Sequence, residues 1–354
     1  MATRRNVLAG LIATAIPRLS WAEVGSPAFV AAARDAEGQA WLHGLSEQGE
    51  SRFRLPLPAR GHAAAAHPSR PEAVAFARRP GVFAIVIDCA EGRVIARLTP
   101  PGGRQFNGHG AFTADGAVLF TSEVVAETSE GRLGIWDARR GYARIGEVAT
   151  HGIGPHDIKR LADGSLVVAN GGIQTDPQDR TKLNIDTMRP NLTYLTAEGE
   201  LSELVELEED YRQNSIRHLA LAPDGTVAFA MQWEGDPADP VPLLGLHKRG
   251  SAARLCPNTD IDAPRMKGYA GSIAIDVAGS RVALTSPPGG VVAVFGMDGT
   301  PLATITRQDA SGIAPGPEGF IVTDGLGAIS ACDETGIRPL NKQATAWDNH
   351  LVQI

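Results

Sequence analysis

Five of the nine histidines occupy the same position in a recurring sequence pattern. The pattern is a turn residue, then the histidine, then a short and mainly apolar segment. These five residues, called here the anchor histidines, are His62, His109, His156, His218 and His350. Neutral imidazole is the commonest metal-binding side chain in proteins, and several imidazoles together suit iron, copper or zinc better than calcium or magnesium. If the fold brings the anchor histidines together, we expect a transition-metal site.

Two other interpretations of the anchor histidines stay open. They could hydrogen-bond between neighbouring repeats and serve structure alone. Protonated imidazoles with Arg217 nearby could instead bind an anion or an organic ligand. The metal interpretation has its own pH dependence, because a ligating imidazole must be neutral. It predicts that metal affinity falls as the pH drops through about 6.5, the ordinary pKa of histidine.

The spacing of the anchors predicts the elements that hold them. Ser272 and Ser311 occupy the anchor position in two further repeats, which makes seven, and successive anchors are 39 to 62 residues apart. That period is typical of propeller blades built from four short antiparallel strands. The 40 Gly and 24 Pro of the 354-residue chain favour tight turns between short strands over long helices. We therefore predict an all-β, seven-bladed β-propeller.

The two ends of the chain are expected to complete one blade between them. The chain stops shortly after His350, so the last repeat has room for a single strand over 350–354. Three strand-like segments near the amino terminus, 28–34, 39–45 and 51–57, can supply the missing strands. This closure would leave no open sheet edge. We expect residues 23–354 to form one propeller domain.

In a propeller of this kind the innermost strand comes first and starts at one face. We therefore expect the anchors at the exposed strand starts, around one mouth of the central channel. The second strand of each blade ends at the same mouth, and a long loop over 171–190 would lie across it as a lid or specificity loop. The accessory candidates at this mouth are His151, Glu123, Asn170, Asn184, Arg217, Glu234, Ser272 and Ser311. Asp348 is expected to orient an imidazole better than Asp157, which neighbours His156 on a strand and so points to the other face.

Two further functional hypotheses come from other classes of protein. One is a metal-dependent lactonase or hydrolase that uses Glu123, Asn170, Asn184 or Glu234 at the same mouth; no catalytic residue can be assigned. The other is an interaction scaffold without metal. The common metalloprotease, serine-hydrolase, redox-cysteine and phosphate-loop motifs are absent from the sequence. Whether the protein is an enzyme is left open at this point.

Charge, cysteine content and the first residues describe the setting. A formal net charge of −7 argues against a nucleic-acid partner. The odd count of cysteines predicts no disulfide framework, and we expect Cys89, Cys256 and Cys332 to be buried thiols. Arg4 and Arg5 precede a short apolar run, 7–16, which predicts a twin-arginine export signal cleaved after residue 22, within 1–22. The run is too short for a mature membrane span, and no other segment approaches that length.

The sequence resembles the family of exported bacterial propellers known as domain of unknown function 1513. The resemblance rests on the arginine pair, on Gly-Pro-His-Asp at 154–157, on Ala-Asn-Gly-Gly-Ile at 169–173 and on the stretch 182–192. Members tend to be encoded beside imelysin-like and cytochrome-peroxidase-like iron-uptake proteins. The resemblance thus implies a periplasmic protein of metal uptake or delivery, with iron as the first candidate, copper or zinc next, and other periplasmic iron-uptake proteins as partners. The anchor histidines are also similar to the all-histidine metal sites of the nitrous oxide reductase propeller and of zinc-chaperone propellers.

Overall fold

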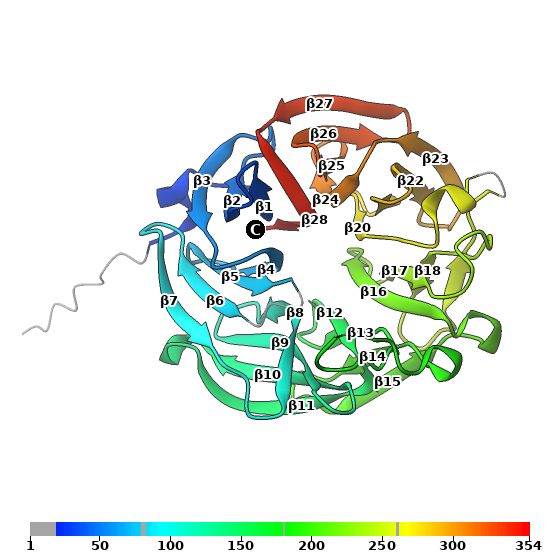
Figure 1. Cartoon of the computed structure of the whole chain (residues 1–354), viewed down its shortest axis with the longest axis horizontal. Coiled ribbons are helices and arrows are strands. Elements are labelled where there is room, and N and C mark those ends of the chain that lie inside the picture. The colour runs from blue at the N-terminus through cyan, green and yellow to red at the C-terminus, as the bar shows by residue number, and fades with distance from the viewer. Residues whose placement is uncertain (1–18, 79–82, 180, 260–261) are drawn as a thin grey trace, which may run out of the picture.

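The protein is a ring of seven four-stranded antiparallel sheets around a central channel (Figure 1). The computed structural model describes residues 19–78, 83–179, 181–259 and 262–354. In six blades the chain runs from the innermost strand outwards, and the seventh blade combines both ends of the chain. The prediction of a seven-bladed propeller is confirmed.

The strands follow the expected repeats from the channel outwards. Blade one contains β4 Gly61–Ala66, β5 Glu72–Ala77, β6 Ala84–Asp88 and β7 Arg93–Leu98, and blade two contains β8 Arg104–Phe112, β9 Val118–Val125, β10 Glu130–Asp137 and β11 Ala143–Ile153. Blade three contains β12 Pro155–Arg160, β13 Leu166–Asn170, β14 Asn191–Leu195 and β15 Leu201–Glu206, and blade four contains β16 Asn214–Leu221, β17 Val227–Trp233, β18 Leu244–His247 and β19 Arg254–Cys256. Blade five contains β20 Ser272–Ile275, β21 Arg281–Ser286, β22 Val291–Gly296 and β23 Pro301–Thr306, and blade six contains β24 Ala310–Gly316, β25 Gly319–Asp324, β26 Ala328–Asp333 and β27 Gly336–Lys342. Blade seven contains β28 Thr345–Gln353, β1 Phe29–Asp35, β2 Ala40–Leu45 and β3 Ser51–Pro56.

Helix is limited to five short 3₁₀ segments among the described residues. They are η1 Trp21–Val24, η2 Ala138–Arg140, η3 Ile185–Thr187, η4 Glu209–Tyr211 and η5 Pro264–Met266. None of them has the length and apolar character that a helix needs to cross a membrane.

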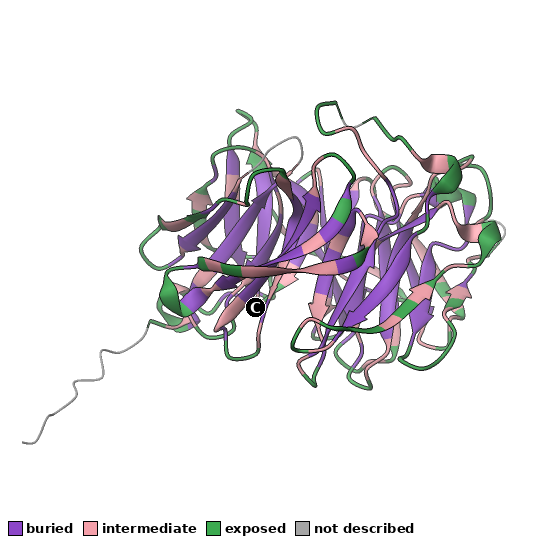
Figure 2. Cartoon of the chain, turned by 90° about the horizontal axis from the view of Figure 1, so that it is seen from below, coloured by how far each residue is buried: buried purple, intermediate pink, exposed green. Residues whose placement is uncertain are grey.

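The inner strands of each blade are buried on both faces of the sheet, because each blade packs between two neighbouring blades. Successive side chains of a strand point to opposite faces and so contact different neighbours. In β5, Ala73 and Ala75 pack toward blade seven, whereas Val74 and Phe76 pack toward blade two. Within the part of the chain that the structure describes, the buried residues form seven apolar clusters, each between two neighbouring blades. Figure 2 shows buried residues along the strands and exposed residues mainly in loops and outer strands. The core is thus divided into layers between the blades, and the channel lies at their inner edge.

The ring closes as predicted, through antiparallel pairing of β28 with β1. The pairing extends from Phe29 opposite Gln353 to Asp35 opposite Thr345. The last strand was expected over 350–354, but β28 begins five residues earlier, at Thr345. The additional residues include Trp347, which is buried in the cluster between blades six and seven.

The predicted export signal lies mostly outside the described residues, including Arg4, Arg5 and the apolar run 7–16. Within the described part, the side chain of Ser20 caps η1. Trp21 is buried, and its indole N–H donates a hydrogen bond of 2.9 Å to the carbonyl oxygen of His67 in blade one. Cleavage after Ala22 stays a prediction.

All three cysteines are free and buried, as the sequence predicted. Burial raises the pKa of the Cys89 and Cys332 thiols to about 12. These thiols are therefore protonated at neutral pH and serve as apolar packing groups.

Candidate metal centre

A β-bulge lies at each anchor histidine. In β4 the pairing with β5 jumps from Gly61–Ala77 to Ala64–Ala75, so that two residues of β4, including His62, face one residue of β5. The inner strands β8, β12 and β28 have register shifts that include their own anchor histidines. In β16 the extra residue is Arg217, and the anchor beside it, His218, pairs with Ala230. Bulges change the direction of a side chain and are frequent beside functional sites. Here they bring imidazoles from five blades together in the channel.

The five imidazoles form one contiguous cluster. Contacting rings have centroid separations of 4.5–5.7 Å, with His62 and His350 the closest pair. Two groups of three offer one donor atom each within 4.8 Å of the others: His62, His109 and His156, and His109, His218 and His350. In a tetrahedral site, two nitrogens bonded to one zinc ion lie about 3.4 Å apart. A metal ion would therefore have to draw the most separated imidazole nitrogens closer by roughly 1 Å or more.

The cluster is more deeply buried than the sequence indicated. His109, His218 and His350 are only 5%, 4% and 7% exposed, and His62 and His156 are half-buried. The expectation of exposed strand starts was wrong for His109, His218 and His350, because β8, β16 and β28 begin four or more residues before these anchors, whereas His62 and His156 are the second residues of β4 and β12. The anchor histidines form a layer across the channel below its mouth.

Several ring nitrogens of the cluster are buried without a hydrogen-bond partner among the described residues. They are His109 Nε2, His156 Nδ1, His218 Nδ1 and His350 Nε2. A buried polar atom without a partner costs free energy, and such atoms are rare in folded proteins unless a water, an ion or a catalytic role accounts for them. Their convergence in one cluster fits the requirements of a nitrogen-ligated metal ion.

The surroundings favour the neutral form of His156, His218 and His350. Burial, followed by the neighbouring imidazoles and Arg217, lowers the pKa of His156 well below its ordinary value. Burial and the same kind of neighbours also lower the pKa of His218 and of His350. Neutral imidazole is the form that binds metal. The expected loss of metal affinity on acidification therefore moves to a pH below 6.5.

The roles of the two aspartates are the reverse of the expected ones. Asp157 Oδ1 lies 3.5 Å from His109 Nδ1, and its carboxylate also accepts a hydrogen bond from the Leu219 amide and pairs with Lys159. Burial by itself would raise the pKa of Asp157, but Lys159 and His109 hold it below its ordinary range. This contact leaves His109 Nε2 to face the cluster. The bulge after Pro155 explains the result, because simple strand alternation does not apply there.

Asp348 turns away from His350 and forms ion pairs instead. Its Oδ2 is 2.7 Å from Arg60 Nε, and its Oδ1 is 2.9 Å from Arg78 Nη1. These contacts join blade seven to blade one at the mouth. Asp348 is therefore not the residue that orients an imidazole.

Two cavities meet the cluster from opposite ends of the channel. The upper cavity, at the end where the inner strands start, has a volume of about 270 Å³. It is lined by His62, Ala77, Arg78, Asn107, His156, Lys182, Arg217, His218, Gln232, Glu234, Tyr269 and Asn349. The lower cavity, about 410 Å³, is lined by the later residues of the inner strands, many of them alanine, isoleucine or leucine, together with His109, His218 and His350. Both ends of the channel thus reach the histidine layer.

The structure brings only part of the accessory set to these cavities. Arg217 and Glu234 line the upper cavity and Ser272 the lower one. The loop over 171–190 reaches the upper cavity through Lys182. The ammonium group of Lys182 contacts Glu234, the residue that follows β17. Asn184 lies within that loop and braces it, accepting a hydrogen bond from the Gln174 amide and donating one to the Gly172 carbonyl.

The remaining accessory candidates are bound elsewhere. Glu123 is fully buried and pairs with Arg144. The Asn170 side chain hydrogen-bonds to Thr150 of blade two and to Asn191 of its own blade. Both side chains are committed to structure, so that Glu234 is the acidic candidate of the hydrolase hypothesis that lines the upper cavity. The Ser311 hydroxyl donates to the carbonyl of Asp309, and His151 is exposed on β11.

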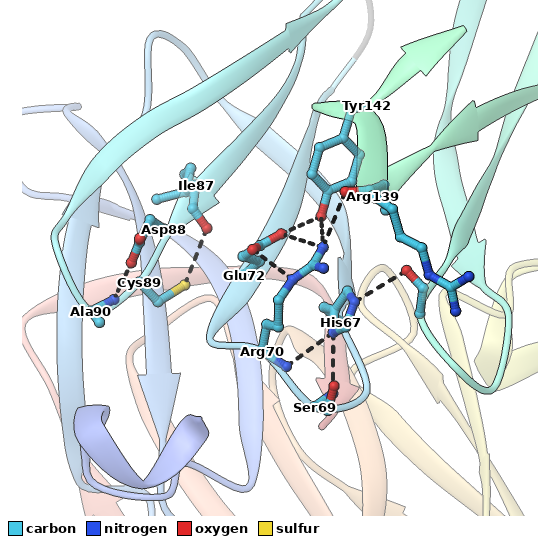
Figure 3. A network of polar contacts seen from close by, with 12 residues as sticks. His67, Ser69, Arg70, Glu72, Ile87, Asp88, Cys89, Ala90, Arg139 and Tyr142 are labelled. Atoms are coloured by element: carbon cyan, nitrogen blue, oxygen red, sulfur yellow. Dashed lines mark hydrogen bonds and ion pairs between the residues drawn. The ribbon is translucent and has the colours of Figure 1, made fainter. Parts of the chain in front are cut away.

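The histidines outside the cluster provide a comparison. His67 Nε2 lies 3.1 Å from the Gly116 carbonyl oxygen, and Nδ1 accepts from the Ser69 and Arg70 amides (Figure 3). His247 contacts the Tyr194 hydroxyl through Nδ1 and the Ser251 carbonyl through Nε2. In both, the two ring nitrogens are used in hydrogen bonds. His67 and His247 thus differ from the anchor histidines. His43, also buried outside the cluster, contacts the Ser51 hydroxyl through Nδ1 and has no described partner at Nε2, but its free nitrogen does not converge with others.

The comparisons with known proteins give a family and a fold. A family model described as "Protein of unknown function (DUF1513)" matches residues 55–354. Among solved structures, the chain is similar to hydrazine synthase of Kuenenia stuttgartiensis, with a TM-score of 0.61 and 12% identity over 88% of this chain and 91% of that chain. It is similar to U3-55K with a TM-score of 0.61 and 11% identity over 94% and 93%. At such identities the likeness concerns the fold alone. No curated protein matches the sequence significantly.

Proposed function

The chain belongs to the family described as protein of unknown function DUF1513, and from that premise we propose that it is a periplasmic metal-binding protein of metal uptake or delivery. The anchor histidines would be the ligands, and iron is the first candidate, followed by copper and zinc. The observation that carries the proposal is the set of buried imidazole nitrogens without partners that converge in the channel. Imidazole suits all three metals, and the affinity of nitrogen sites for divalent ions peaks at copper. Iron is nevertheless the first candidate, because members of the family that the sequence resembles tend to be encoded beside iron-uptake proteins.

The cluster would supply neutral nitrogen ligands in a site that water enters through the two cavities. Asp157 supports this role by contacting the far nitrogen of His109, as carboxylates commonly do behind metal-bound histidines. The lowered pKa of His156, His218 and His350 favours the neutral ligand form. Several ligands come from different blades, so metal binding would also tie these blades together.

The periplasmic setting is part of the same proposal. The arginine pair Arg4-Arg5, the apolar run 7–16 and the small residues before position 23 support export by the twin-arginine route. That route carries folded proteins, which suits a site assembled from the whole ring. Other periplasmic iron-uptake proteins would be the partners that give or receive the metal.

The test is metal analysis of the protein purified from the periplasm, followed by titration with Fe²⁺, Cu²⁺ and Zn²⁺. Replacing His109 and His156 with Ala removes two ligands, and we expect affinity to fall by more than the roughly 10- to 100-fold that loss of a supporting residue costs. At 100 times its dissociation constant, the metal should stabilise the wild-type fold by about 2.7 kcal/mol.

The matched control is His247→Ala, which removes a buried histidine whose two nitrogens already have partners. We expect this variant to lose stability while it keeps the metal affinity of the wild type. If the wild type binds none of the three metals, or binds them as tightly after both anchor substitutions, the anchor histidines are not metal ligands. The structural and the anion-binding interpretations of these histidines would then stand against the proposed function.

A further inference from the structure

The upper cavity has a charge opposite in sign to that of the protein. The chain carries a formal charge of −7, yet the lining of this cavity contains three cations, Arg78, Lys182 and Arg217, and one carboxylate, Glu234. The three histidines of its floor do not cancel this excess. A small polar space above a metal-binding cluster thus carries a local positive charge.

The excess persists when ion pairs are counted. Asp348 is shared between Arg60 and Arg78, and Glu234 is shared between Lys182 and Arg217, with 3.9 Å from Glu234 Oε1 to Arg217 Nη2. In each case one carboxylate faces two cations. Among the described residues, the group around Glu234 therefore keeps one net positive charge. In the group around Asp348, Asp309 also interacts with Arg60 and offsets the excess, while Asp348 holds the Arg78 guanidinium in place at the cavity.

The two cationic groups lie on opposite walls of the cavity. Arg78 follows β5 and, with Arg60 and Asp348, belongs to the junction of blades one and seven. Arg217 and Glu234 belong to blade four, and Lys182 reaches them from the loop of blade three. Figure 1 shows β5 and β17 across the channel from each other. A ligand that satisfies both walls needs at least two separated anionic groups.

We propose that the upper cavity binds a small polycarboxylate, either free or as the chelate in which the metal arrives. Arginine pairs with carboxylates through charge-assisted hydrogen bonds in a fork geometry, and such bonds are stronger than neutral ones. The cavity volume of about 270 Å³ is below the usual range for sites that bind drug-sized ligands, and it suits a small polycarboxylate. The floor of His62, His156 and His218 would then face the metal of a bound chelate; this last step rests on the proposed metal function, whereas carboxylate binding does not.

The probe is citrate, titrated into metal-free protein by calorimetry, with acetate and inorganic phosphate as comparison anions. The test variant is Arg78→Gln combined with Lys182→Gln, which removes one cation from each wall. Because each lost bond is charge-assisted, we expect citrate affinity to fall by at least about 10-fold per substitution. Zn²⁺ affinity should stay the same or rise, since two repelling charges are removed. Weaker citrate binding beside an unchanged or higher Zn²⁺ affinity excludes misfolding as the cause.

The matched control is Lys248→Gln combined with Arg249→Gln. These residues form ion pairs with Asp224 and Asp163 and line neither cavity. The control should bind citrate as the wild type does. Absence of citrate binding by the wild type, equal binding by the cavity variant, or acetate or phosphate bound as tightly as citrate would overturn the proposal. Citrate binding by a protein that binds no metal would refute the proposed function and leave this inference standing.

Discussion

Lowering the pH from about 7.5 to about 5.5 tests whether His156, His218 and His350 are neutral inside the metal-free protein, because a histidine whose pKa is lower in the folded than in the unfolded state makes stability fall with pH in this range. In the folded protein, burial and neighbouring groups lower the pKa of His156, His218 and His350. In the unfolded chain each has the ordinary value of about 6.5. Below that pH the unfolded state binds more protons than the folded state. The free energy of unfolding must therefore decrease as the pH falls.

The size of the effect follows from the number of groups. One pH unit below the unfolded pKa, three histidines that stay neutral in the fold cost about 4 kcal/mol of stability. A typical domain has only about 5–15 kcal/mol in total. Acidification to about pH 5.5 should thus remove a large fraction of the stability without any change in the contacts that the structure contains.

The assay is urea unfolding followed by tryptophan fluorescence, with EDTA present to remove metal. The double variant His156→Gln with His218→Gln lacks two of the three histidines. Between the two pH values, its loss of unfolding free energy should be smaller than that of the wild type by about 3 kcal/mol. His43→Gln is a control of the reasoning, because burial and Arg54 lower the pKa of His43 to about 4 and it lies outside the channel. Its removal should reduce the loss by about 1 kcal/mol. An equal loss in the wild type and the double variant would refute the assignment of neutral buried imidazoles.

Four further predictions concern the ring, the supporting residues and export. Deletion of β28, residues 345–354, should abolish cooperative unfolding or solubility, and a normal cooperative melt in scanning calorimetry would contradict the closure. Asp157→Asn should weaken Zn²⁺ binding by about 10- to 100-fold in competition with a chelating dye, whereas unchanged affinity would limit Asp157 to structure. Gly108→Ala should also weaken Zn²⁺ binding, because its Cβ would lie 2.7 Å from His62 Cδ2; Gly103→Ala, with a similar positive φ but no atom within 4 Å, should leave binding intact. Replacing Arg4 and Arg5 by Lys should hold the precursor in the cytoplasm in cell fractionation, and continued accumulation in the periplasm would indicate the general secretory route.

The sequence by itself determined the architecture, because its evidence is local and repeated. Short apolar strands, turn residues and an anchor recur seven times, and the strands missing from the last repeat are present at the other end of the chain. The same repetition identified the five anchor histidines, since a propeller places equivalent positions of every blade at the same depth in the channel.

The tertiary structure decided the depth and partners of the side chains. The bulges at the anchors shift the strands by only one or two residues, which leaves the apolar pattern almost unchanged but redirects His109 and Asp157. The pairing of Asp348 with Arg60 and Arg78 joins residues from opposite ends of the chain, and it exists only once the ring has closed. Glu123 and Asn170 lie at the ends of second strands, which predicted a place at the channel mouth. Contacts with neighbouring strands hold their side chains away from the channel. Sequence repetition fixes which residues are equivalent, whereas the partner of each side chain depends on contacts between blades that no local pattern records.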